Sequence, residues 1–285
     1  MIRNVFRRKS LLASPYLIWS VGFTVIPLIV IFQYAFTDAE GHLTLENVTA
    51  IADPIHLKAF IFSLEIALVC TLLCILLAYP LVMALKHLKL SKGSFMLFVL
   101  LLPMWMNFIL RLLAWQMLLS SNGIINFALG KLGLAPMKIA NTSIAIMIGV
   151  IYEYLPYMIL PIYNAIIEIP TDVIEAARDL GAGPWTVFRK VIVPLSMPGL
   201  KSGITMVFVP SMTSFVIANI LGGGKLQLIG NIIEQEFNYS SNWHLGSGLS
   251  VALMAFVLLS MAFTIRDEEQ QTLPAASGAE GTPGN

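Results

Sequence analysis

The segment "EAARDLGAGPWTVFRKVIVPLSMPG" (residues 175–199) differs in composition from the sequence around it. It carries five charged side chains, two closely spaced glycines and three prolines, and it lies between two long apolar segments. Of the 285 residues in the chain, 57% are hydrophobic and only 12% are charged, whereas soluble domains carry roughly 25% charged residues. The chain is therefore predicted to be a membrane protein, with residues 175–199 in one of its polar loops.

Six segments are apolar enough to cross a bilayer, and each is near the required length of about 20 residues. They lie at about 11–36, 60–85, 95–119, 141–163, 197–221 and 247–265. The sequence thus predicts an all-α polytopic membrane protein, with six transmembrane helices in a domain over 11–265. The first apolar run is too long for a cleaved signal peptide. The ends are residues 1–10 and the polar, Pro- and Gly-rich tail 266–285, which is predicted to be disordered.

The distribution of Lys and Arg predicts the orientation, because these residues gather in cytoplasmic loops. One set of loops holds twelve of them: Arg3, Arg7, Arg8, Lys9, Lys86, Lys89, Lys92, Arg178, Arg189, Lys190, Lys201 and Arg266. The other set holds Lys58, Lys131, Lys138 and Lys225. Both termini and the loop 171–195 are therefore predicted to be cytoplasmic, in a multi-pass protein of the cytoplasmic (inner) membrane.

The loop 171–195 specifies two short helices. Thr171 is expected to cap a helix over about 172–180, and Gly181 to end that helix in a left-handed conformation. Gly183-Pro184 opens a second helix, and Pro194 is expected to end it. The polar loop is therefore predicted to be folded and to lie outside the bilayer.

The first of these helices is predicted to be amphipathic. Its two sides carry Val173, Ile174, Ala177 and Leu180 on the one, and Asp172, Glu175, Arg178 and Asp179 on the other. Such a helix either lies among lipid headgroups or docks on another protein. Helices that lie among headgroups usually have a basic polar face and bulky apolar residues. Here the polar face is mainly acidic, and Ala176 and Ala177 permit close approach, so the pattern favours docking on a protein.

The spacing in this loop is similar to that of a known family. Glu175-Ala176-Ala177, then Gly181 after three residues, and then Val191-Ile192-Val193-Pro194 resemble the EAA loop of ABC importer permeases, in which the last four residues usually read I-x-L-P. The resemblance implies a type I permease fold, in which the loop docks into a cytoplasmic ATPase. The residues it assigns to this coupling loop are Glu175, Ala176, Ala177, Arg178, Asp179, Gly181 and Pro194.

The same resemblance implies the partners. They are a second permease in a heterodimer, two copies of a cytoplasmic ABC ATPase, and an extracytoplasmic substrate-binding protein. This chain is expected to be no enzyme and to bind no cofactor, since ATP and Mg would be used by the partner ATPase. The "GGGK" at 222–225 is not a P-loop, because Asn219 and Leu226 stand where Gly and Ser/Thr are required. No pattern indicates nucleic-acid binding.

Three further stretches, 101–126, 174–199 and 220–237, are similar to the spermidine/putrescine permeases, and most like the first permease of that pair. This similarity implies transport of polyamines. Transport of another small organic solute is the alternative, because selectivity in these systems lies largely in the binding protein.

Two carboxylates, Glu65 and Glu153, fall inside predicted spans, where ionisable groups are costly and usually pair or face a cavity. Each could pair with Arg111 or contact a passing polycation. The aromatic residues Trp105, Tyr152 and Tyr157 could attract ammonium groups, or could serve as lipid-interface anchors and ordinary packing. These five residues, Arg111 apart, are the candidate substrate path.

The sequence does not favour either of two other classes of protein. "HLGSGLS" (244–250) would suit an intramembrane serine protease only if nucleophile and base came from separate elements, and His244 and Ser247 lie at one end of one span. A secondary transporter would often show inverted repeats, which the two halves of the sequence do not. Cys70 and Cys74 are interpreted as small buried hydrophobes and not as metal ligands.

Overall fold

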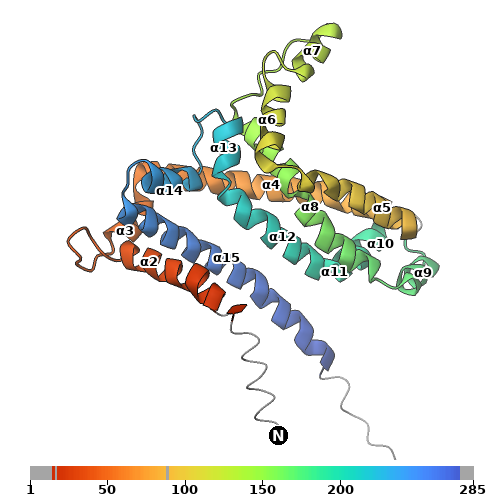
Figure 1. Cartoon of the computed structure of the whole chain (residues 1–285). Coiled ribbons are helices and arrows are strands. Elements are labelled where there is room, and N and C mark those ends of the chain that lie inside the picture. The colour runs from red at the N-terminus through yellow and green to blue at the C-terminus, as the bar shows by residue number, and fades with distance from the viewer. Residues whose placement is uncertain (1–14, 17, 88–89, 277–285) are drawn as a thin grey trace, which may run out of the picture. The chain divides into compact units, whose positions relative to one another are not determined.

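The computed structural model describes residues 15–16, 18–87 and 90–276, and in this part of the chain the repeating secondary structure is entirely helical. Five helical segments are long and apolar enough to cross a membrane: Ile18–Ala35, Pro54–Lys86, Phe108–Lys131, Ser143–Ile167 and Trp243–Ala262. A sixth is present if the bent pair Pro184–Leu195 and Met197–Met212 counts as one span. The prediction of an all-α membrane protein with about six spans is confirmed (Figure 1).

The chain divides into two compact units, Met1–Leu57 with Ile232–Leu258, and Lys58–Asn231 with Leu259–Asn285. The helices of the first unit are η1 (Val21–Val25), α2 (Ile26–Ala35), α3 (Glu46–Thr49), η2 (Ala50–Ala52) and the first part of α15 (Trp243–Ala276). His244 packs edge-on against Tyr34, and its Nδ1 lies 2.6 Å from the carbonyl oxygen of Thr37. His244 therefore ties α15 to the end of α2, which is a structural role and not that of a protease base.

The second unit contains the coupling loop and most of the spans. Its helices are α4 (Pro54–His87, which begins in the first unit), α5 (Leu90–Leu101), η3 (Leu102–Trp105), α6 (Phe108–Leu119), α7 (Ile124–Lys131), α8 (Ser143–Ile167), α9 (Thr171–Asp179), α10 (Pro184–Val187), η4 (Phe188–Ile192), α11 (Val193–Leu195), α12 (Met197–Met212) and α13 (Phe215–Leu221). The helix α14 (Ile229–Asn238) crosses from this unit into the first.

Two apolar clusters form the core of the second unit. The loop-side cluster joins α4, α8 and α12 to the coupling loop through buried residues that include Val82, Met158, Ile166, Ile174, Val187 and Val207. The far cluster joins α4, α6, α8 and α13 through Ile66, Leu112, Ile146, Ile217 and Leu228. Since α4 and α8 contribute to both clusters, these two helices run through the whole unit.

The helices α8 and α12 lie side by side (Figure 1) and pack closely. A β-carbon on Gly203 would lie 2.7 Å from the sulfur of Met158, and one on Gly199 would clash with the carbonyl of Pro161. Small residues of this kind let helix backbones approach in a membrane. This close packing joins α12 to the C-terminal half of α8, the half that leads into the coupling loop.

The third and fifth predicted spans, 95–119 and 197–221, are interrupted. Between η3 and α6 the chain is extended at Met106, and Asn107 caps α6 by accepting the N–H of Leu110 at 3.1 Å. Between α12 and α13 the helical ladder ends at Thr213 and Ser214. Both spans read as continuous in hydropathy because the breaks are made by short polar side chains among apolar residues.

The tail also differs from the prediction of disorder over 266–285. The helix α15 continues to Ala276, and residues 277–285 lie outside the described part of the chain. Residues 266–271, "RDEEQQ", contain mainly good helix formers, so they extend the preceding span as a helix. The predicted N-terminal segment 1–10 also lies outside the described residues.

A labelling experiment tests the predicted orientation. Glu46, Ser241 and Thr186 are all exposed, so a cysteine at each position is open to reagent on whichever side it faces. In a background without Cys70 and Cys74, an impermeant maleimide added outside should label cysteines at 46 and 241. A cysteine at 186 should react only after the membrane is permeabilised. Labelling of residue 186 in intact cells would show that the coupling loop faces outward.

Candidate functional site

The coupling loop begins with α9, whose start differs from the prediction. Pro170 is the N-cap, with an extended ψ of 138°, and Thr171 is already the first helical residue. The expectation that Thr171 caps the helix is therefore wrong. Proline serves here because its φ is preset and the helix start needs no N–H from it. Asp172 lies in the first turn, where a negative charge is favoured by the helix dipole.

Gly181 ends α9 as the sequence predicts. Its φ is +84°, in the left-handed region. The N–H of Gly181 donates to the carbonyl of Arg178 at 2.8 Å, and the N–H of Ala182 donates to the carbonyl of Ala177 at 3.1 Å. This pair of bonds is a Schellman motif, which satisfies the last carbonyls of a helix. The turn after α9 is thus built by the backbone and depends on a residue that tolerates positive φ.

The packed side of α9 is narrower than the sequence indicates. Ile174 is buried and Ala177 is half-buried, and both belong to the loop-side cluster. The sequence predicts Val173 and Leu180 on the same side, but Leu180 is 89% exposed and Val173 is 43% exposed. The helix contacts the rest of the unit along one short edge, so there is little apolar surface below it to cover these two residues. Most of α9 is therefore open to a partner.

The second part of the loop is longer than expected. From Pro184 the chain runs through α10, the π-helical turn η4 and α11 to Leu195, so Pro194 does not end it. Pro194 sits in the first turn of α11, where its missing N–H costs little. The turn comes at Ser196, and the helices on its two sides are bent by 69°. The hydroxyls of Ser196 and Tyr79 lie 2.9 Å apart, which ties this bend to α4.

A lysine on α4 secures the end of α8, directly before the coupling loop. The Nζ of Lys86 donates to the carbonyl of Ile166 at 3.0 Å, an arrangement that suits the negative end of a helix. Beside it lies a cavity of about 280 Å³, lined by Met83, Lys86, Thr171, Ile174, Glu175, Arg178, Pro184, Val187 and Ile192. From the sequence, Lys86 indicates only the orientation of the chain, because nothing local points to a partner 80 residues away.

Among the predicted path residues, Glu153 is paired inside the protein. The guanidinium of Arg111 donates to the Glu153 carboxylate and to the carbonyl of Pro103. Arg111 is 6% exposed, and its guanidinium lies over the ring of Tyr152, 5.8 Å from the centroid. Of the two roles left open by the sequence, the structure shows the ion pair, and Tyr152 belongs to the same group.

The other predicted path residues lie apart from this pair, on the surface of the chain. Glu65 is exposed on α4, and Trp105 is 79% exposed at the end of η3. Tyr157 is 36% exposed on α8 and stands 6.1 Å from the ring of Tyr154. The structure therefore does not gather the five candidates into one site within this chain.

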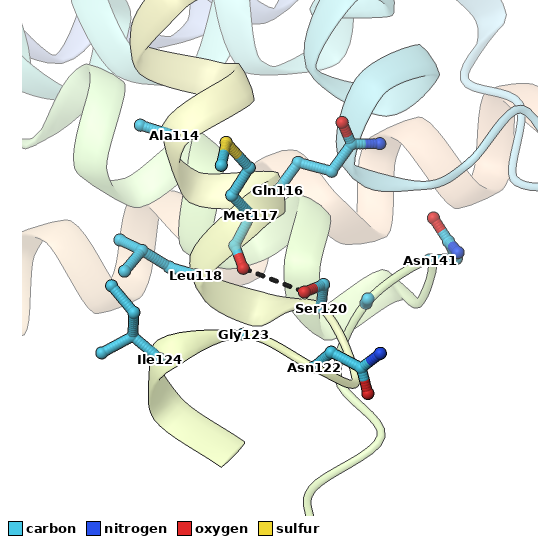
Figure 2. Close-up of a pocket in the computed structure, with 10 residues that line it drawn as sticks. Ala114, Gln116, Met117, Leu118, Ser120, Asn122, Gly123, Ile124 and Asn141 are labelled. Carbon is cyan, nitrogen blue, oxygen red and sulfur yellow. Dashed lines mark hydrogen bonds between the residues drawn. The ribbon is translucent and has the colours of Figure 1, made fainter. Parts of the chain in front are cut away.

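A further pocket, of about 680 Å³, lies between α6, the turn before α7 and the segment before α8 (Figure 2). The amide side chains of Gln116, Asn122 and Asn141 line it, together with the hydroxyl of Ser120, which donates to Met117. Every lining side chain is uncharged, so this pocket has no carboxylate for a cation.

Comparison with known proteins identifies the family. Residues 11–267 match the family described as "Binding-protein-dependent transport system inner membrane component". The chain belongs to this family. It is accordingly a multi-pass inner-membrane permease of the ABC importer type, as the EAA spacing predicted.

Individual relatives agree with this assignment. The "Spermidine/putrescine transport system permease protein PotB" of Haemophilus influenzae is 36% identical over 85% of this chain and 87% of its own length. The protein of the same name from Escherichia coli K12 is 35% identical over 82% and 88%. A solved bacterial alginate ABC transporter, crystallised with a periplasmic protein bound to an alginate pentasaccharide, matches with a TM-score of 0.78 over 95% of this chain and 98% of its own, at 16% identity. At that identity the match concerns the fold alone.

The left-handed turn of the permease loop gives a direct test. Gly181→Val forces a β-branched residue into positive φ, which costs at least about 1–2 kcal/mol. No atom lies within 4 Å of a β-carbon there, so the cost is conformational. We expect normal membrane insertion and loss of substrate-stimulated ATP hydrolysis in the reconstituted importer.

The control for this variant is Gly183→Val. Gly183 is also open to a β-carbon, but its φ of −66° and ψ of 163° suit any residue before a proline. Gly183→Val should keep wild-type stimulation. Full stimulation in Gly181→Val would show that the conformation of this turn does not matter for coupling.

The ion pair of Arg111 and Glu153 gives a second test. Glu153→Gln leaves a buried cation unpaired, a change that typically costs about 3–5 kcal/mol, so the protein should accumulate poorly and take up little substrate. Arg111→Gln with Glu153→Gln removes both charges and should recover much of the accumulation. Uptake per molecule in this double variant decides the role of Glu153. Recovery of uptake would show that Glu153 serves to neutralise Arg111, whereas a stable double variant without uptake would show that transport itself needs the pair.

Proposed function

We propose that this permease forms, with a second permease, the path by which polyamines such as spermidine and putrescine cross the inner membrane. The observation that carries the proposal is the 36% identity to a spermidine/putrescine permease over 85% of this chain. A match of that extent includes the coupling loop. The 16% identity to alginate transporters supports the fold and gives no support to a polysaccharide substrate.

In this proposal two copies of an ABC ATPase dock on the coupling loops from the cytoplasm, and they bind the ATP and Mg that drive transport. The support lies in the exposure of α9, on which Glu175, Ala176, Arg178, Asp179 and Leu180 are all uncovered in the single chain. Ile174 and Ala177 hold the opposite edge to the loop-side cluster. A displacement of α9 would therefore also displace α4, α8 and α12, which pack in the same cluster.

The polyamine itself would be delivered by an extracytoplasmic binding protein, and the path would lie against the second permease. Glu65 supports this arrangement, because an exposed carboxylate within an apolar span is costly unless it faces a cavity or a partner. The exposed rings of Trp105 and Tyr157 could meet an ammonium group on the same route. Glu153 contributes less, because Arg111 neutralises it.

Reconstitution tests the proposal. The two permeases, the ATPase and the binding protein are purified together, placed in vesicles and supplied with ATP and labelled spermidine. We expect ATP-dependent accumulation that unlabelled putrescine inhibits and that an uncharged sugar does not. Accumulation should also fall in Glu65→Gln and remain in Glu168→Gln, a carboxylate at the end of α8 beyond the span. Uptake of a neutral solute, with none of spermidine, would contradict the polyamine assignment.

A further inference from the structure

Two consecutive residues of α8 lie where the two apolar clusters meet. Tyr154 packs against both the loop-side cluster and the far cluster, as does Ile151 one turn earlier. The side chains of Glu153 and Tyr154 leave α8 in different directions, and each leads to one of the two interrupted spans. This level of the unit is therefore the place where α8 meets both interruptions.

Tyr154 holds the interruption between α12 and α13. Its hydroxyl lies 2.8 Å from the Oγ of Ser214. Ser214 Oγ in turn donates to the carbonyl of Pro210 at 2.7 Å, so the tyrosine is the donor to the serine. On another side, the buried amide of Asn231 donates to the carbonyl of Phe215 at 3.1 Å. The polar groups at this break are thus held by side chains from α8 and α14.

Glu153 holds the other interruption through Arg111. The carbonyl of Pro103, in the first turn of η3, accepts one bond from the Arg111 guanidinium and a second, at 3.2 Å, from the N–H of Met106. The same guanidinium is bound to Glu153. The carboxylate therefore fixes the arginine, and the arginine fixes the turn between η3 and α6.

Glu153 and Tyr154 are both on α8, and the C-terminal half of α8 packs against the coupling loop. It contains Pro156 and Pro161, each of which removes a backbone hydrogen bond and lets a helix bend. If α8 bent at Pro156, its C-terminal half could move with the coupling loop while Tyr154 and the residues before it stayed in place. The bonds of Glu153 to Arg111 and of Tyr154 to Ser214 tie this part of α8 to the neighbouring spans and would oppose such a bend.

We propose that Glu153 and Tyr154 are positioning residues, which hold both interruptions on α8 so that a displacement of the coupling loop moves them together. The proposal rests on the proposed function in one respect, namely that an ATPase displaces this loop. It assigns to the two side chains a role in coupling and not in substrate contact.

The Tyr154–Ser214 bond provides the cleaner test, because its variants carry no charge. Tyr154→Phe and Ser214→Ala each remove the bond, and Ser214→Thr keeps a hydroxyl. The matched control is Ser211→Ala, which removes the bond of a buried serine to Val207 in its own helix, with no link to α8. All variants are made in the complete importer and measured in vesicles for ATP hydrolysis and for spermidine uptake.

We expect the spermidine imported per ATP hydrolysed to fall about two- to tenfold in Tyr154→Phe and Ser214→Ala, the range for one lost hydrogen bond. The two together should be no worse than either alone, as partners in one interaction require. Ser214→Thr and Ser211→Ala should keep the wild-type ratio. A wild-type ratio in both bond-breaking variants, or effects that simply add, would overturn the proposal.

Basal ATP hydrolysis separates this proposal from the polyamine assignment, because it needs no transported solute. Without the link, the ATPases move a smaller load, so basal hydrolysis should rise about two- to fivefold in Tyr154→Phe and Ser214→Ala, on the scale of one hydrogen bond, and stay unchanged in Ser211→Ala. If the wild-type importer takes up no spermidine, but basal hydrolysis rises in Tyr154→Phe and Ser214→Ala and not in Ser211→Ala, the substrate proposal fails and the positioning role stands. If the wild-type importer takes up spermidine, but basal hydrolysis is unchanged in Tyr154→Phe and Ser214→Ala, the polyamine assignment stands and the positioning role fails.

Discussion

A bilayer offers no water to backbone N–H and C=O groups, so each of these groups within a span must be bonded inside the protein. Much of the structure of the second unit follows from this constraint. Where the third and fifth predicted spans are interrupted, at Met106 and Ser214, polar side chains from neighbouring helices bond to the backbone around the break. Several buried polar residues of this apolar protein, among them Arg111, Ser214 and Asn231, are accordingly found beside the ends of helices.

This arrangement explains how, in the proposed importer, a loop with little packed surface would act on the spans. Ile174 of α9 is buried in the same cluster as Met158 and Ile166 of α8 and Val207 of α12. Lys86 secures the last turn of α8, and the small residues of α12 allow close packing below the breaks. A displacement of the loop therefore enters a closely packed part of the unit, and Pro156 and the two interruptions lie farther from the loop.

A carboxylate inside a span can either pair with a cation of the protein or contact a cationic substrate. Glu153 is stabilised in the protein interior by Arg111, and this pairing makes it less available to a passing cation. Glu65 has the opposite character, since it is exposed on α4 within an apolar span. In the proposed pair of permeases, the exposed carboxylate of Glu65 is a group that the second subunit would cover.

The fold class, the approximate spans and the short helix that ends at Gly181 could be predicted from the sequence, because they depend on local signals. Hydropathy marks a span whatever its neighbours are, and Gly181 predicts a left-handed turn that the structure shows at φ +84°. Three features depended instead on residues distant in the chain: the choice of Arg111 as partner of Glu153, the exposure of Leu180, and the breaks at Met106 and Ser214. Only the tertiary structure decides these, because burial and bonding of a side chain depend on which helices pack beside it.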